Sequence, residues 1–113
     1  LESDPQWMAD IAAGVDDPRF RLCLDVGHAH VCSEIDVMQW LETLAPWLTH
    51  FHIHNNDRSF DTLSPLDQGT IPMKTFLTCA DALCPDATFT LEVTDGRRDV
   101  DWLLRQGILE EET

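Results

Sequence analysis

The stretch FRLCLDVGHAHV, residues 20–31, decides the interpretation of the chain. Its first half alternates between two faces of an extended strand, one with Phe20, Leu22 and Leu24 and the other with Arg21, Cys23 and Asp25. We expect a strand over residues 20–25 that ends in a carboxylate, followed by a loop that contains His28, His30 and Cys32. Gly27 would free the backbone for a tight turn that brings Asp25 and His28 to one centre.

Two further stretches repeat the alternation of the first. In THFHIH, residues 49–54, the apolar Phe51 and Ile53 point one way, and the other face carries His50, His52 and His54. In TFTLEV, residues 88–93, the apolar face carries Phe89, Leu91 and Val93, and the opposite face carries Thr88, Thr90 and Glu92. Both stretches therefore predict strands with one apolar face.

Helical patterns separate these strands. Helix starts are predicted at Asp4-Pro5, at Asp36 and at Pro72, and a last short helix holds Val100, Leu103 and Leu104. A long polar loop is expected from Asn55 to Thr70. Alternating strands and helices are typical of a parallel sheet with right-handed crossovers.

The apolar pattern of the strands selects the architecture. A doubly wound sheet carries helices on both faces, so its strands are apolar on both, whereas here only one face is apolar. A (β/α) TIM barrel explains this pattern, since its strands turn one face to the helices and form the active site at their C-terminal ends. A full barrel needs about 250 residues, so we expect residues 1–113 to be a single domain, the C-terminal half of a barrel with about four βα units.

Features at the start of the chain agree with this interpretation. The chain begins with Leu1 rather than Met, and Leu1-Glu2 is interpreted as a strand stub, so we expect a piece of a longer enzyme. A half-barrel has two open sheet edges, and a symmetric homodimer is one way to close them.

The composition argues against several classes of protein. The chain has 21 acidic and 7 basic side chains and a formal net charge of -14, which disfavours nucleic acid and anionic membranes as partners. Its 4 cysteines form no C-x-x-C pair, and we expect reduced bystander thiols in a cytoplasmic protein. No signal peptide and no apolar run long enough to span a bilayer is visible in the sequence.

Three polar residues fall at or near the C-terminal ends of different strands, on the face away from the helices: Asp25, His52 and Glu92. Converging carboxylates and imidazoles are what a divalent cation requires. Each residue has another reading: Asp25 as a cap for the following loop, and the three histidines of residues 50–54 as a solvated strand face. Glu92 is harder to explain otherwise, because an unpaired buried carboxylate is costly.

At this point the segments LCLDVGHAHV, HFHIHNND, PLDQGTI and TLEV resemble the last strands of the xylose isomerase-like TIM barrel superfamily. That group includes sugar and sugar-phosphate isomerases and epimerases, and an apurinic-site endonuclease branch. The resemblance implies four metal ligands, Glu2, Asp25, His52 and Glu92. It also implies that His28 and Arg58 hold substrate oxygens.

The resemblance implies a metal-dependent isomerase or epimerase that acts on a small sugar, sugar phosphate or polyol. A divalent Mn, Zn, Co or Mg ion would act with Glu2 and Glu92, which exchange a proton through an enediolate. Asp61-Thr62-Leu63 lacks the histidine of the D-x-H pair that the endonuclease branch carries, which argues against that branch. Metal-dependent phosphodiester or dehydratase chemistry, and a non-catalytic half-barrel that binds metal or ligand, remain the alternatives.

Overall fold

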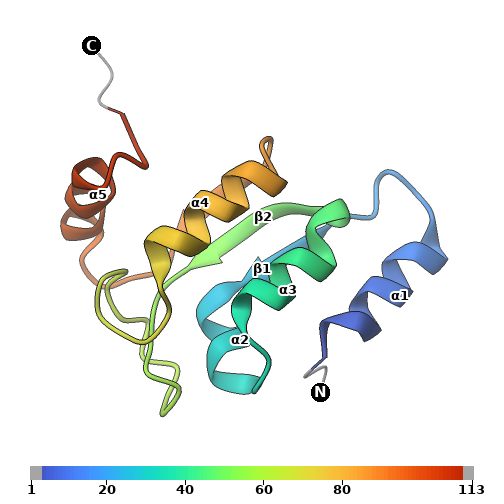
Figure 1. Cartoon of the computed structure of the whole chain (residues 1–113), viewed down its shortest axis with the longest axis horizontal. Coiled ribbons are helices and arrows are strands. Elements are labelled where there is room, and N and C mark those ends of the chain that lie inside the picture. The colour runs from blue at the N-terminus through green and yellow to red at the C-terminus, as the bar shows by residue number, and fades with distance from the viewer. Residues whose placement is uncertain (1–3, 111–113) are drawn as a thin grey trace.

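The computed structural model describes residues 4–110, so the predictions for Leu1 and Glu2 lie outside it. Within this range three parallel strands form one sheet in the order β1 (Leu22–Asp25), β2 (Leu48–Ile53) and β3 (Thr88–Leu91). Figure 1 shows β1 and β2 behind a layer of helices. The predicted parallel sheet with helices is confirmed.

The connections between the strands are helical, as predicted. The first helix of the described residues is α1 (Pro5–Val15). The strand β1 is joined to β2 through α2 (Val26–Cys32), α3 (Val37–Leu44) and the 3-10 helix η1 (Ala45–Trp47). The helix α4 (Met73–Leu83) joins β2 to β3, and α5 (Gly96–Arg105) follows β3.

Two of the predicted helix starts carry side-chain caps. Asp4 accepts a hydrogen bond from the backbone N–H of Gln6 at 2.9 Å, and Asp36 accepts one from Met38 at 2.8 Å. These carboxylates bind N–H groups that have no partner within the helix, which is why α1 and α3 begin where the sequence predicts.

The prediction of a loop after Asp25 is wrong, because α2 begins directly at Val26. The side chain of Asp25 is the N-cap of this helix and accepts a hydrogen bond from the backbone N–H of His28 at 2.9 Å. A helix therefore places His28 one turn from Asp25, where we expected a tight turn.

The two faces of the sheet have different surroundings, as the alternation predicts. Phe51 and Phe76 are fully buried, and their rings pack edge to face with centroids 6.1 Å apart, which joins β2 to α4. On the other face Cys23, Thr88 and Thr90 are exposed. Helices therefore cover β2 on one face of the described sheet, whereas Phe89 of β3 on the same face is 38% exposed, and the other face is open.

The loop after β2 is anchored at both ends by buried polar side chains. Asn55 is 1% exposed, and its amide group donates to the carbonyl oxygens of Leu66 and Ile71 and accepts from the N–H groups of Asn56 and Ile71. Further along, Asp99 of α5 accepts a hydrogen bond from the N–H of Leu66 at 3.1 Å. The loop is therefore held firmly beside the C-terminal end of β2.

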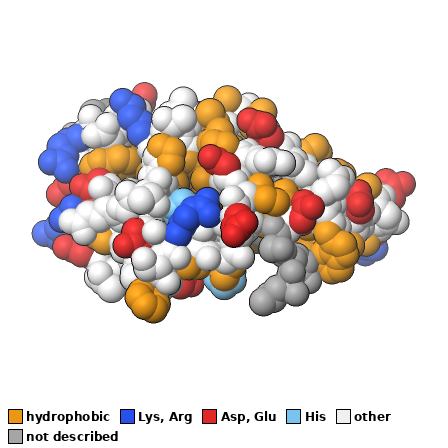
Figure 2. Space-filling view, turned by 60° about the horizontal axis from the view of Figure 1, so that its bottom comes forward, with side chains coloured by type: hydrophobic (Ala, Val, Ile, Leu, Met, Phe, Trp, Pro, Cys, Tyr) orange, Lys and Arg blue, Asp and Glu red, His pale blue; other side chains and the backbone are white. Residues whose placement is uncertain are grey.

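The surface is rich in carboxylates. Figure 2 shows acidic side chains spread over one face, with most of the Lys and Arg side chains gathered at the end where α5 lies. Among residues 4–110 all four cysteines are free, and no helix is long and apolar enough to cross a membrane.

Candidate metal centre

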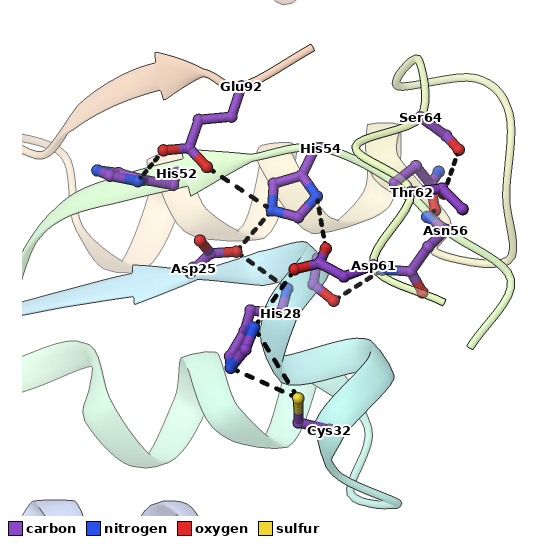
Figure 3. A network of polar contacts seen from close by, with 12 residues as sticks. Asp25, His28, Cys32, His52, His54, Asn56, Asp61, Thr62, Ser64 and Glu92 are labelled. Carbon is purple, nitrogen blue, oxygen red and sulfur yellow. Dashed lines mark hydrogen bonds and ion pairs between the residues drawn. The ribbon is translucent and has the colours of Figure 1, made fainter. Parts of the chain in front are cut away.

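Three side chains converge at the C-terminal ends of the strands: Asp25, His54 and Glu92. One ligand atom from each lies within 4.8 Å of the others, and in the described part of the chain this is the one such group of three. Nε2 of His54 is 2.6 Å from Oδ1 of Asp25 and 4.0 Å from Oε2 of Glu92 (Figure 3). Two carboxylates and one imidazole are a donor set that suits a divalent cation.

Each of these side chains has a local reason for its position. Asp25 ends β1 and caps α2, so its carboxylate is held at the strand end. Glu92 directly follows β3, and its N–H donates to the carbonyl of Ile53 at 3.1 Å, which keeps its backbone beside β2. His54 follows β2 and is 0% exposed.

The burial of His54 explains Gly27. A Cβ atom at position 27 would lie 2.2 Å from both Cε1 and Nδ1 of the His54 imidazole. The first turn of α2 therefore packs directly on this ring, and glycine is required for close approach. We expected Gly27 to serve a tight turn, so the residue is structurally necessary for a different reason.

The electrostatics of the group follow from burial and from opposite charges. Burial by itself raises the pKa of Asp25, but hydrogen bonds from His54 and from the N–H of His28 outweigh it and lower that pKa. Burial lowers the pKa of His54, but the hydrogen bond to Asp25 and the carboxylates of Asp25, Asp61 and Glu92 raise it overall. A cation that binds here would replace the proton that His54 holds against Asp25.

Asp61 lies on the opposite side of the His54 ring. Its Oδ1 is 3.6 Å from Nδ1 of His54, and its Oδ2 is 3.4 Å from Nδ1 of His28. A histidine that binds metal through one ring nitrogen usually directs the other toward a carboxylate or carbonyl group, which fixes its orientation. Asp61 faces Nδ1 of His54 at ion-pair distance, but this nitrogen makes no hydrogen bond in the described structure.

His52 does not belong to the group of three, but its side chain contacts Glu92, which does. Its Nδ1 is 2.6 Å from Oε1 of Glu92, and both side chains are 34% exposed. Successive residues on one face of a strand are about 6.6 Å apart, so His52 lies one step further down the strand than His54.

The two predicted substrate-binding residues take different positions. His28 is exposed, and Cys32 Sγ lies 3.4 Å from its Nε2. Arg58 has a left-handed backbone with φ of 74°, and its Nη1 donates to the carbonyl of Ser33 at 2.8 Å, at the C-terminal end of α2. Glu2 lies outside the described residues.

The sequence reasoning selected His52 and not His54, which is the histidine of the group of three; that His52 binds metal stays a prediction. The signal available was the shared parity of the three histidines in residues 50–54, which shows that they face the same side but not which one is level with Glu92. The strand pairing decides this: His52 pairs with Thr90, so Glu92, two residues later, is level with His54.

Comparison with known proteins gives a match to a family model. A family model described as xylose isomerase-like TIM barrel matches residues 2–109 of the chain. No curated protein and no solved structure matches the chain.

Proposed function

Because the chain belongs to the xylose isomerase-like TIM barrel family, we propose that it is the metal-binding part of a divalent-metal-dependent isomerase or epimerase of small sugars or related polyols. The observation that carries the proposal is the convergence of Asp25, His54 and Glu92 at one point. These three residues, together with Glu2, are the proposed ligands. His52, the ligand that the sequence predicts, remains the alternative histidine ligand, because its Nδ1 is 2.6 Å from Oε1 of Glu92.

The proposed chemistry is proton transfer at the carbon next to a carbonyl group. The bound cation supplies Lewis acidity, which stabilises the negative charge that develops on the substrate oxygens. Glu92 is one proposed proton carrier, since its carboxylate is partly exposed and lies at the open face of the sheet. Glu2 is proposed as the second carrier, on the other side of the reacting carbon.

Two neighbouring residues are proposed to orient the substrate. His28 is exposed beside the group and is held by Asp61, so its ring is available to a substrate oxygen. Arg58 donates one hydrogen bond to the carbonyl of Ser33, and its remaining N–H groups are the proposed contacts to substrate.

The charge of the chain supports a small substrate over a nucleic acid. A net charge of -14 repels a phosphate backbone, and acidic side chains are spread over the face that Figure 2 shows. For this reason we do not favour phosphodiester chemistry.

A non-catalytic metal-binding module is the second candidate. It is favoured by the openness of the site, because the Asp25 and Glu92 side chains are 36% and 34% exposed and the polar face of the described sheet is uncovered. Such a site would bind a cation without enclosing a substrate.

Hydrogen exchange in D₂O separates the two candidates. The chain is loaded with Mn²⁺ and incubated with a panel of ketoses and aldoses. Proton NMR follows the loss of the signal of the proton on the carbon beside the carbonyl group. An isomerase exchanges this proton, and Glu92→Gln should slow the exchange about 100-fold or more. Glu42→Gln, an exposed carboxylate on α3, is the matched control. Binding of Mn²⁺ without exchange would support the non-catalytic module, and absence of Mn²⁺ binding would refute both.

A further inference from the structure

We propose that Cys32 is a site of thiol–disulfide exchange with small disulfides, and that His28 is the general base that activates its thiol. The contacts of the His28 ring carry the proposal. Its Nε2 lies 3.4 Å from Sγ of Cys32, and its Nδ1 lies 3.4 Å from Oδ2 of Asp61 (Figure 3). A thiol, a base within reach of it and a carboxylate that orients the base form the arrangement of an activated nucleophile.

The helix α2 brings the thiol and the ring together. His28 and Cys32 are four residues apart, so they lie on the same face of this helix. The N–H of His28 donates to the capping carboxylate of Asp25 at 2.9 Å, which fixes the first turn. Both side chains are exposed, so a small molecule in solution can reach the sulfur.

The surroundings of the ring decide how it acts. Because Nδ1 faces the carboxylate of Asp61, the ring proton is favoured on Nδ1, and Nε2 keeps a lone pair for the thiol of Cys32. Cys32 is the last residue of α2, and the C-terminal end of a helix carries a partial negative charge that disfavours a stored thiolate. The proton is therefore removed by His28 during the attack.

The exchange is a single balanced displacement. Nε2 of His28 accepts the thiol proton while Sγ of Cys32 attacks one sulfur of the disulfide. A new S–S bond forms between Cys32 and that sulfur, and the original S–S bond breaks, with its electron pair leaving on the second sulfur. This leaving thiolate takes the proton from His28 and departs as a thiol, so Cys32 is oxidised and the small disulfide is reduced.

The other cysteines lack this arrangement. Within residues 4–110 none of the other three has a hydrogen-bond contact with an imidazole, and Cys84 is buried, as structural and unreactive thiols are. Cys23 is exposed, like Cys32. It is therefore an internal comparison, accessible to the same reagent but without a base.

An adduct on Cys32 would lie beside the ring of His28 and occupy space that a substrate bound by this ring needs. This consequence rests on the proposed function, whereas the exchange reaction itself does not.

The rate of adduct formation at each cysteine tests the proposal. The purified chain is incubated with bis(2-hydroxyethyl) disulfide, which is uncharged and therefore not concentrated or repelled by the acidic surface. Samples are quenched with acid, and peptide mass spectrometry gives the rates at Cys32 and Cys23. His28→Gln keeps a polar side chain but cannot act as a base. His50→Gln is the matched control, because its imidazole contacts hydroxyl groups of β3 instead.

We expect Cys32 of the wild type to react about 10-fold faster than Cys23 or more, and His28→Gln to slow Cys32 by about the same factor. Asp61→Asn removes the charge that orients the ring and should slow Cys32 about threefold or more, whereas His50→Gln should leave its rate within about twofold of wild type. Circular dichroism checks that each variant is folded.

Equal rates at Cys32 and Cys23 in the wild type would overturn the proposal. An unchanged rate at Cys32 in either His28→Gln or Asp61→Asn would also overturn it, and so would an equal loss in His50→Gln. None of these results depends on Mn²⁺ binding or on sugar exchange, so a failure here is distinguishable from a failure of the proposed function.

Discussion

A methyl group at position 27 has no room next to the imidazole of His54. The Cβ atom of alanine would lie 2.2 Å from two ring atoms, and ordinary contacts between such atoms are about 3.5 Å. The ring or the first turn of α2 must therefore move by about 1.3 Å, the difference between these distances. The contact of His54 with Asp25 is 2.6 Å long and passes the usual hydrogen-bond limit of about 3.2 Å after a much smaller shift.

Gly27→Ala should therefore lower both stability and metal affinity. Overpacking a core typically costs about 1–3 kcal/mol. Loss of a hydrogen bond to a charged group adds about 1.5–3 kcal/mol. We expect urea unfolding to report a total loss of about 2.5–6 kcal/mol, a large share of the stability of a small domain.

A double-mutant cycle shows whether the clash with His54 is the cause. His54→Ala removes the ring, so Gly27→Ala should cost little more in that background. Gly14→Ala in α1 is the matched control, because a Cβ atom there meets nothing within 4 Å, and alanine favours a helix by about 1 kcal/mol. The reasoning is refuted if Gly27→Ala is equally costly with and without the His54 ring.

Three further predictions concern stability. Asn55→Ala removes the amide that binds four backbone groups, so urea unfolding should show a loss of stability of at least about 3 kcal/mol. Asn55→Asp keeps only the acceptor atoms, so its stability should lie between those of wild type and Asn55→Ala. A loss below about 1 kcal/mol in Asn55→Ala would contradict this. Burial raises the pKa of Asp99, whose Oδ2 has no hydrogen-bond partner within residues 4–110, so the folded chain holds this proton more tightly than the unfolded chain does. Wild type should therefore lose stability relative to Asp99→Asn as the pH rises from about 4 through the pKa of Asp99 in the folded chain. Parallel curves of stability against pH for the two proteins would show that Asp99 does not titrate this way. Reducing agent should leave the unfolding midpoint unchanged, since all four cysteines are free in the described structure; a shift would reveal a disulfide.

Local patterns in the sequence determined much of the fold. Alternation along residues 49–54 depends only on the geometry of one strand, so it predicts which side chains share a face before any partner strand is known. Capping by Asp4 and Asp36 is equally local, since each carboxylate binds an N–H two residues away. The helix α2 was missed because Gly27 resembles a turn signal, whereas its role depends on His54, which is distant in sequence.

Only the tertiary structure decided which residues meet at the site. The pairing of β1 with β2 shifts by one residue between Leu22 and Cys23, and this brings Asp25 level with His52; without the shift it would be level with Phe51, which faces the helices. From that register Asp25 reaches forward to His54, and the pairing of β2 with β3 brings Glu92 level with the same residue. The sequence by itself therefore determined the face and the strand end on which the acidic and histidine side chains lie. The register between strands is set by hydrogen bonds between distant segments. It decided that His54 lies with Asp25 and Glu92, whereas His52 contacts only Glu92 among the site carboxylates of the described chain.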